Sequence, residues 1–418
     1  MNRGLVVVFL IQFIVAISEC YASSSIPSES ALNGISFDVP KVWPCEELSC
    51  DGVKALWLEG EKFNGKPTWV FAYLAMPTNV DKSAKVPGMV LAHGGAGTAY
   101  RTWASRWAKR GYAAIVVDNC GAIPVRGPGA KKWIRSEVGG PDGWGRFDLA
   151  LKPASEQWPY HAVGALVRAH SYLRSLNAVD KDRTGITGVS WGGYLTVLTS
   201  SFDKRFKLAM PVYACGFYDE MIRYTRFYER DMTMNKEATA RWCELFDSKH
   251  YAARMDLPVF WFASSNDAAF PFDLLQKTLR LPKKRPLAAI RVRMAHSHGP
   301  AGENMPELYM FADHIFNDGP RLPEVSEPEL ENGEIKVEFN MYSYALKRVD
   351  LNWTKAEVLD KKSHWEINSF SAPKESVFRV KVPEGARRAY VNFVIEGETD
   401  EVRYPEALVS SFAIEIGK

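Results

Sequence analysis

The feature that most constrains this chain is a serine at a glycine-flanked turn between a strand-like run and a helix-like run. The pentapeptide at 188–192 reads Gly-Val-Ser-Trp-Gly, follows the run 182–186 and precedes the apolar run 194–198. The two glycines remove side chains that would clash in so sharp a turn. The turn leaves the N–H groups of Ser190 and Trp191 at a helix N-terminus, where a developing negative charge is favoured. The pattern predicts an exposed serine nucleophile, although an N-capping serine at a glycine-rich turn has the same letters.

The two groups that a serine nucleophile needs lie just after later strand-like runs. Asp267 follows one apolar run, and His296 and His298 follow the next. A serine hydroxyl needs a base within hydrogen-bond reach, and the base needs a carboxylate that fixes its tautomer. The order predicts a triad of Ser190, Asp267 and His296, with His298 as the alternative base. Asp267 also suits ordinary Asn-Asp turn chemistry, but its place after a strand favours the catalytic role.

A second glycine-rich turn follows the strand-like run 86–92 and begins His93-Gly94-Gly95. It is not followed by a P-loop lysine and does not fit G-x-G-x-x-G, so no phosphate site is predicted. We expect the N–H of Gly95 to be an oxyanion donor beside that of Trp191, and His93 to hold the loop.

The rest of the first three quarters of the chain alternates between strand-like and helix-like runs, which predicts a mostly parallel sheet with helices on both faces. Strands are expected at 68–77, 86–92, 112–118, 182–186, 208–213, 257–263 and 287–294, and helices at 102–110, 158–176 and 305–316. The stretch 119–150 is expected to form a long loop at the ligand-binding edge. The stretch 216–256 is either a lid over the pocket or a surface helical insertion.

Composition divides the chain into segments. Residues 1–22 have the basic start, apolar centre and small-residue end of a secretory signal peptide, and 23–54 form an N-terminal segment. The catalytic domain is expected at 55–322. From 323 to 418 apolar and polar residues alternate with period two, which predicts an all-β sandwich domain.

The balance of charge excludes the simplest polyanionic partners. The 418 residues include 52 basic and 49 acidic side chains, so we predict neither nucleic acid nor, after signal cleavage, a membrane as partner. A signal peptide implies a secreted or periplasmic protein, and there Cys45 and Cys50 are close enough in sequence to close a small disulfide loop. No third ligand lies near His296 and His298 in sequence, so neither a metal nor another cofactor is expected.

Residues from about 55 to 320 resemble the secreted serine esterases of the dienelactone hydrolase and prolyl oligopeptidase-like superfamily. The resemblance is carried by His93-Gly94-Gly95, by the pentapeptide with Gly193, by Asn266-Asp267 and by the stretch 295–299. Within that superfamily the chain looks most like the acetyl xylan esterase or cephalosporin C deacetylase type. The resemblance implies an α/β-hydrolase fold in which Ser190 is the nucleophile, Asp267 the acid and His296 the base, with no cofactor.

The implied substrate is a small ester or an acetylated polysaccharide, cleaved through an acyl-enzyme. Two alternatives stay open. One is a serine peptidase of the prolyl oligopeptidase-like type, although the sequence lacks the long N-terminal propeller that such enzymes usually carry. The other is a hydrolase relic that binds glycans without catalysis, which the intact order of serine, acid and histidine disfavours.

Overall fold

The computed structural model describes residues 27–78, 80–81, 83–125, 133–143, 149–221, 223–224, 236–396 and 405–417. The expected signal peptide lies outside the described residues. None of the described helices combines the length and the apolar character that crossing a bilayer requires.

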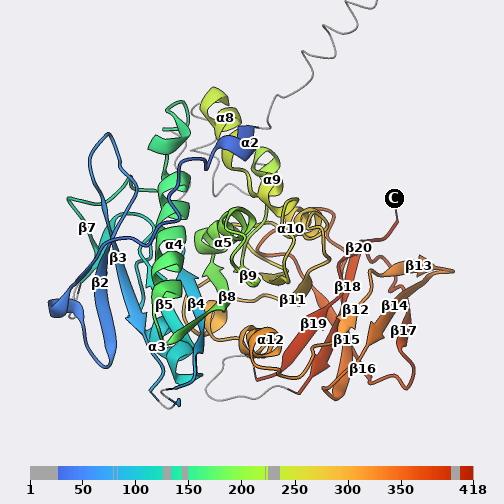
Figure 1. Cartoon of the computed structure of the whole chain (residues 1–418). Coiled ribbons are helices and arrows are strands. Elements are labelled where there is room, and N and C mark those ends of the chain that lie inside the picture. The colour runs from blue at the N-terminus through green and yellow to red at the C-terminus, as the bar shows by residue number, and fades with distance from the viewer. Residues whose placement is uncertain are drawn as a thin grey trace, which may run out of the picture.

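A nine-stranded sheet forms the centre of the first domain, with strand order β1-β2-β3-β5-β4-β8-β9-β10-β11 (Figure 1). The strands are β1 (Val42–Pro44), β2 (Val53–Glu59), β3 (Trp69–Ala75), β4 (Val86–Ala92), β5 (Ala113–Val117), β8 (Val179–Val189), β9 (Leu208–Val212), β10 (Phe260–Ser264) and β11 (Leu287–Arg291). Pairing is antiparallel from β1 to β5 and parallel from β5 to β11. Every residue of β4, β5, β9 and β10 is buried, which explains their continuous apolar sequences.

Helices pack on the sheet in two groups, and the α/β-hydrolase fold is confirmed. The helices are α2 (Pro27–Ser30), α3 (Arg101–Lys109), α4 (Trp158–Ser175), α5 (Trp191–Phe202), α6 (Tyr218–Met221), α8 (Lys236–Phe246), α9 (Ser248–Ala252), α10 (Phe272–Leu279), α11 (Pro300–Glu303) and α12 (Pro306–Phe316). In one group α4 contacts α5, and α5 contacts α9. In the other, α3 meets α12 through the rings of Trp107 and Tyr309, 4.8 Å apart.

Three details differ from the sequence prediction. The expected domain start at residue 55 falls inside β2, and β1 from the segment 23–54 joins the same sheet. The expected loop 119–150 contains a short hairpin of β6 (Ala122–Pro124) and β7 (Trp133–Arg135). Cys45 and Cys50 are free thiols. The stretch 216–256 contributes α6, α8 and α9, and a lid role for it stays a prediction.

The C-terminal part is a sandwich of two antiparallel sheets, as predicted. One sheet contains β12 (Glu324–Val325), β13 (Glu329–Glu331), β14 (Glu334–Asn340) and β17 (Val377–Lys381), and the other contains β15 (Leu346–Thr354), β16 (Glu366–Ser371), β18 (Arg388–Ile395), β19 (Ala407–Ser410) and β20 (Ile414–Glu415). The rings of Phe339 and Phe393, 4.7 Å apart, join the two sheets.

The sandwich covers the outer edge of the central sheet (Figure 1). The backbone N–H of Ile290 in β11 donates to Ser410 Oγ at 2.8 Å, and Asn392 Nδ2 donates to the Ile290 carbonyl at 3.1 Å. Arg388 makes a two-pronged ion pair with Asp273 of α10, at 2.9 and 3.0 Å. At Ile290 the second domain therefore satisfies both backbone groups of the edge strand.

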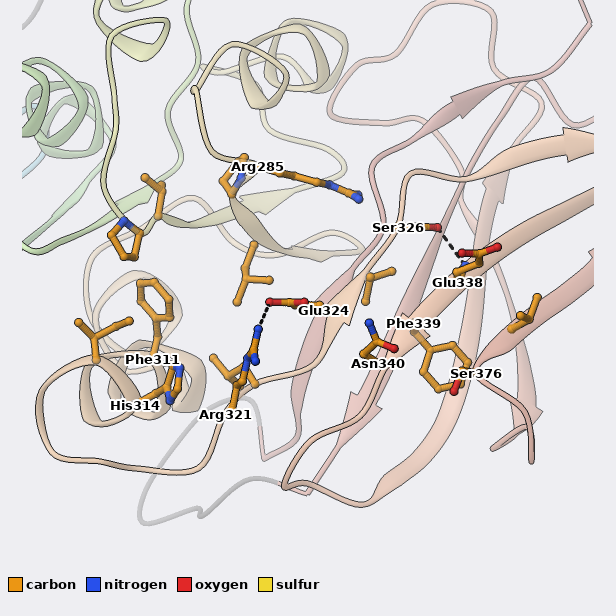
Figure 2. Close-up of a pocket in the computed structure, with 18 residues that line it drawn as sticks. Arg285, Phe311, His314, Arg321, Glu324, Ser326, Glu338, Phe339, Asn340 and Ser376 are labelled. Atoms are coloured by element: carbon orange, nitrogen blue, oxygen red, sulfur yellow. Dashed lines mark hydrogen bonds and ion pairs between the residues drawn. The ribbon is translucent and has the colours of Figure 1, made fainter.

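A cavity of about 910 Å³ lies between the two domains (Figure 2). Its lining includes Val259 and Leu287, at the N-terminal ends of β10 and β11, and Phe339 from the sandwich. Asp267 and His296 follow the C-terminal ends of the same strands. The cavity therefore lies at the opposite end of the sheet from the predicted catalytic residues.

Candidate active site

Ser190 occupies the sharp strand-to-helix turn that its sequence predicts, between β8 and α5. Its backbone has φ of 61° and ψ of −120°, a region that non-glycine residues rarely adopt. A Cβ on Gly192 would lie 1.9 Å from the Ala92 carbonyl oxygen, and one on Gly188 would lie 2.2 Å from the Gly192 carbonyl oxygen. The turn therefore requires glycine at both positions.

One part of the expectation for this turn is wrong. The Ser190 N–H is not available at the helix N-terminus, because it donates to the Val212 carbonyl at 2.8 Å and extends the pairing of β8 with β9. The expected oxyanion role at this turn therefore rests on the N–H of Trp191, the first residue of α5.

The three predicted triad residues meet at the C-terminal edge of the sheet. His296 Nε2 lies 2.8 Å from Ser190 Oγ, and His296 Nδ1 lies 2.8 Å from Asp267 Oδ2. The second oxygen of Asp267 accepts the N–H groups of Ala269 and Phe270, at 2.8 and 3.0 Å. The carboxylate side chain is only 2% exposed, so these three hydrogen bonds, and not water, set its orientation. The order of hydrogen bonds matches that of a serine, a base and an orienting acid.

Two aromatic rings that the sequence analysis missed hold the His296 imidazole in its plane. Tyr213 stacks on it with ring centroids 4.7 Å apart, and Phe270 lies parallel to it at 6.0 Å. The Tyr213 hydroxyl donates to the Ala295 carbonyl at 2.6 Å, which ties the histidine loop to the end of β9. The sequence signal for Tyr213 was its position as the last residue of the predicted strand 208–213, at the active edge.

The loop after β4 approaches the nucleophile as predicted. His93 Nε2 accepts the Asn119 N–H at 3.1 Å, and His93 Nδ1 lies 2.9 Å from the Gly94 carbonyl, so its ring braces the loop. A Cβ on Gly94 would lie 3.0 Å from Ser190 Cβ, which shows how closely the loop packs on the nucleophile. Among the described residues, no acceptor contacts the Gly95 N–H.

His298, the alternative base, has both ring nitrogens bonded to groups other than the nucleophile. Its Nε2 accepts the Gly94 N–H at 2.8 Å, and its Nδ1 lies 2.8 Å from Glu303 Oε1. The geometry therefore favours His296 as the base. Glu303 was not foreseen, because nothing in its local sequence distinguishes it from a surface glutamate at a helix end.

One group of potential metal ligands occurs within the described part of the chain: His93, Asp118 and Cys120. Each already has a protein partner. Asp118 Oδ2 accepts the N–H groups of Cys120 and Ala122, at 3.2 and 2.7 Å. Burial raises the pKa of the Cys120 thiol far above its usual range, which keeps the sulfur protonated and a poor ligand. We therefore read this group as a brace of the loop rather than a metal centre.

A strained serine, a histidine and a buried carboxylate at one edge of a mostly parallel sheet form the arrangement that is typical of serine hydrolases with the α/β-hydrolase fold. Comparison with known proteins agrees with this arrangement. Residues 151–316 match the model of the prolyl oligopeptidase family, and this segment contains Ser190, Asp267 and His296.

Individual relatives are distant. The probable dipeptidyl-peptidase 5 of Emericella nidulans is 29% identical over 169 residues, which cover 38% of this chain and 20% of that protein. The quorum-quenching protein AidA of Acinetobacter baumannii is 29% identical over 161 residues, which cover 38% of this chain and 43% of that protein. The chain thus spans less than half the length of either curated relative. The solved acetyl xylan esterase from Paenibacillus sp. R4 has a TM-score of 0.53 at 19% identity and covers 69% of this chain and 92% of that one, which shows a shared fold.

Proposed function

We propose that the protein hydrolyses carboxylic esters through an acyl-enzyme on Ser190, and that its substrate is a small acetyl ester or an acetylated polysaccharide. The observation that carries the proposal is the continuous hydrogen-bonded chain from Ser190 Oγ through His296 to Asp267. The same geometry disfavours a relic that only binds glycans, because a relic has no need to keep this chain assembled.

In the first half-reaction His296 Nε2 takes the Ser190 hydroxyl proton while Oγ attacks the ester carbonyl carbon. The carbonyl oxygen becomes an oxyanion, which the N–H groups of Gly95 and Trp191 stabilise. The imidazolium, held by Asp267, then gives its proton to the departing alcohol as the carbon–oxygen bond breaks. In the second half-reaction water attacks the acyl-enzyme, His296 takes its proton and returns it to Ser190 Oγ, and the free acid leaves.

An indole at the rim of the site supports a carbohydrate as the alcohol part of the ester. Trp133 of β7 donates its Nε1–H to the Ala96 carbonyl at 3.3 Å, which places the indole against the loop that carries Gly95. An aromatic face in that position gives a sugar ring a surface to stack on. The Paenibacillus protein that shares the fold is an acetyl xylan esterase, which agrees with this substrate class.

The test combines a small ester with acetylated polymers. We expect the wild type to hydrolyse p-nitrophenyl acetate and to release acetate from at least one acetylated polysaccharide, and Ser190→Ala to lose both activities. Trp133→Ala should raise KM for the polymer and leave KM for p-nitrophenyl acetate unchanged. Ester turnover that survives in Ser190→Ala would contradict the mechanism.

A serine peptidase is the second candidate, because residues 151–316 match a peptidase family and a curated relative is a probable dipeptidyl-peptidase. The triad chemistry is the same, with an amine as leaving group in place of an alcohol. A panel of aminoacyl and dipeptidyl p-nitroanilides separates the two. Higher kcat/KM on an anilide than on every ester tested would favour the peptidase.

A further inference from the structure

His298 is held at both ring nitrogens beside the nucleophile without touching it. Nε2 lies 2.8 Å from the Gly94 backbone nitrogen, and Nδ1 lies 2.8 Å from Glu303 Oε1. The ring packs against Tyr100, with centroids 4.7 Å apart, and its side chain is 19% exposed. Gly94 directly precedes Gly95, the expected oxyanion donor.

These two contacts fix the protonation state of the ring. A backbone N–H can only donate, so Nε2 must present its lone pair to Gly94. The proton of a neutral imidazole then sits on Nδ1, where the Glu303 carboxylate accepts it. The other oxygen of Glu303 accepts Arg106 Nη1 at 3.1 Å, which holds the carboxylate in place. Only the neutral ring with its proton on Nδ1 satisfies every partner.

We propose that His298 is a positioning residue that sets the Gly94–Gly95 turn against Ser190 and so aims the Gly95 N–H at the oxyanion. The proposal deepens the proposed ester hydrolysis and rests on it. The turn has little freedom on its other side, because a Cβ on Gly94 would lie 2.7 Å from the Val189 carbonyl oxygen. Loss of the hydrogen bond at Gly94 is therefore expected to move the turn relative to the nucleophile, because the turn is packed against protein and not against solvent.

The arrangement also predicts that the contribution of His298 to catalysis is lost at acid pH. Burial lowers the pKa of His298, while its hydrogen bond and attraction to Glu303 raise it in part, and the nearby rings of His93 and His296 lower it further. Arg106 lies beyond Glu303, and Tyr100 is the other titratable group against the ring. His298 therefore stays neutral below the usual range of a histidine. When it does protonate, two N–H groups face each other and the turn is released, so the contribution is present at neutral pH and lost in acid.

The kinetic test compares two substitutions. His298→Ala removes the acceptor, and we expect kcat on p-nitrophenyl acetate to fall by up to about 10²-fold with KM little changed, as for loss of an oxyanion donor. The affinity for a boronic acid that forms a tetrahedral adduct with the serine should fall by the same factor. His298→Gln places an amide oxygen near the position of Nε2, so it should recover most of kcat. An unchanged kcat in folded His298→Ala, or a Gln variant no better than Ala, would overturn the proposal.

His170 provides a matched control. It is a buried histidine remote from the nucleophile, bonded to Asp203 at 2.7 Å and to Thr184 at 2.9 Å. His170→Gln tests the general cost of losing a buried imidazole, and we expect it to lower the melting temperature while leaving kcat unchanged. A fall in kcat equal to that of His298→Ala would show that the effect is not specific to the loop.

A second readout does not depend on turnover. Only Gly94 and Gly299 follow a histidine in the sequence, so labelling histidine carbonyl carbon and glycine nitrogen together selects these two amides by NMR. The Gly94 amide signal should stay constant through the pH range where an ordinary histidine titrates and shift at lower pH. In His298→Gln that acid shift should be absent. If the wild type hydrolyses nothing, the proposed function fails, and this signal still decides whether His298 holds Gly94.

Discussion

The loop that carries Asp267 is tied to the second domain through its neighbour Asn266, and this contact gives a sharp prediction. Asn266 Nδ2 donates to the Ser363 carbonyl at 2.7 Å and to the Asp360 carbonyl at 3.3 Å, both in the sandwich. We expect Asn266→Ala to lower kcat with little change in KM. The reason is that the backbone of Asp267 loses its anchor, so the carboxylate no longer fixes His296 as firmly.

The magnitude follows from the two hydrogen bonds. Each contributes about 1 kcal/mol, so the loss of both costs about 2 kcal/mol. If this whole free energy is lost from the positioning of Asp267 in the transition state, kcat falls by about 30-fold. If the two hydrogen bonds stabilise only the contact between the domains, the free energy of unfolding falls by about 2 kcal/mol and kcat stays unchanged.

The assay is steady-state hydrolysis of p-nitrophenyl acetate together with equilibrium unfolding in urea. His364→Ala is the control, because His364 also bridges the domains, with Nδ1 3.1 Å from Arg293 Nη2, but its side chain is 68% exposed. We expect that control to change the free energy of unfolding by less than about 0.5 kcal/mol and to leave kcat unchanged. A wild-type kcat in Asn266→Ala would refute the idea that the sandwich positions the acid.

Three further predictions concern the acid, the domain contact and pH. Asp267→Asn should lower kcat by about 10⁴-fold in the same ester assay, because an amide can donate to His296 Nδ1 and fix the wrong tautomer. Arg388→Ala should lower the free energy of unfolding in urea by about 1–3 kcal/mol, since it leaves the partly buried Asp273 carboxylate without its partner. Burial lowers the pKa of His170 from 6.5 to about 4, so the unfolded chain takes up that proton first and stability is lost as pH falls across this interval. His170→Gln should flatten this part of the stability profile measured by urea unfolding.

The parts of the site that sequence predicted are those whose signals are local. The sharp turn is predicted by a pattern of five residues, in which Gly188 and Gly192 flank Ser190 at a fixed spacing. Asp267 and His296 were found because each follows a buried strand, and the carboxyl ends of parallel strands share one edge. Their meeting within hydrogen-bonding distance is confirmed, and their catalytic roles stay a prediction that the kinetics above test.

The parts that sequence missed depend on contacts between distant segments. His298 lies 204 residues from Gly94 in the sequence, so no local sequence pattern indicates that its ring accepts the Gly94 N–H. Strand β1 was missed for a different reason. It has three residues and ends in a proline, which is too short for a period of two to show.

The sandwich shows the same limit at the level of a domain. Its strand β14 alternates between buried and exposed residues, so period two predicted it directly. Strand β18 is almost wholly buried, because one face packs on the other sheet and one face packs on the hydrolase domain. Burial on both faces erases the alternation, and only the docked structure explains it.

That docking bears on what the sandwich does. Trp365, one of the two tryptophans of the sandwich, is 4% exposed and packs between Phe272 of α10 and Tyr390 of β18, at 5.2 and 5.3 Å. The other, Trp353, is half-buried and donates its Nε1–H to Asn368 Oδ1 at 2.5 Å. A buried indole offers no face to a sugar, whereas it contributes strongly to an interface between domains. The aromatic contacts therefore favour a sandwich that supports the loop carrying Asp267. Trp133, at the rim of the site, is the better candidate for stacking on a sugar ring.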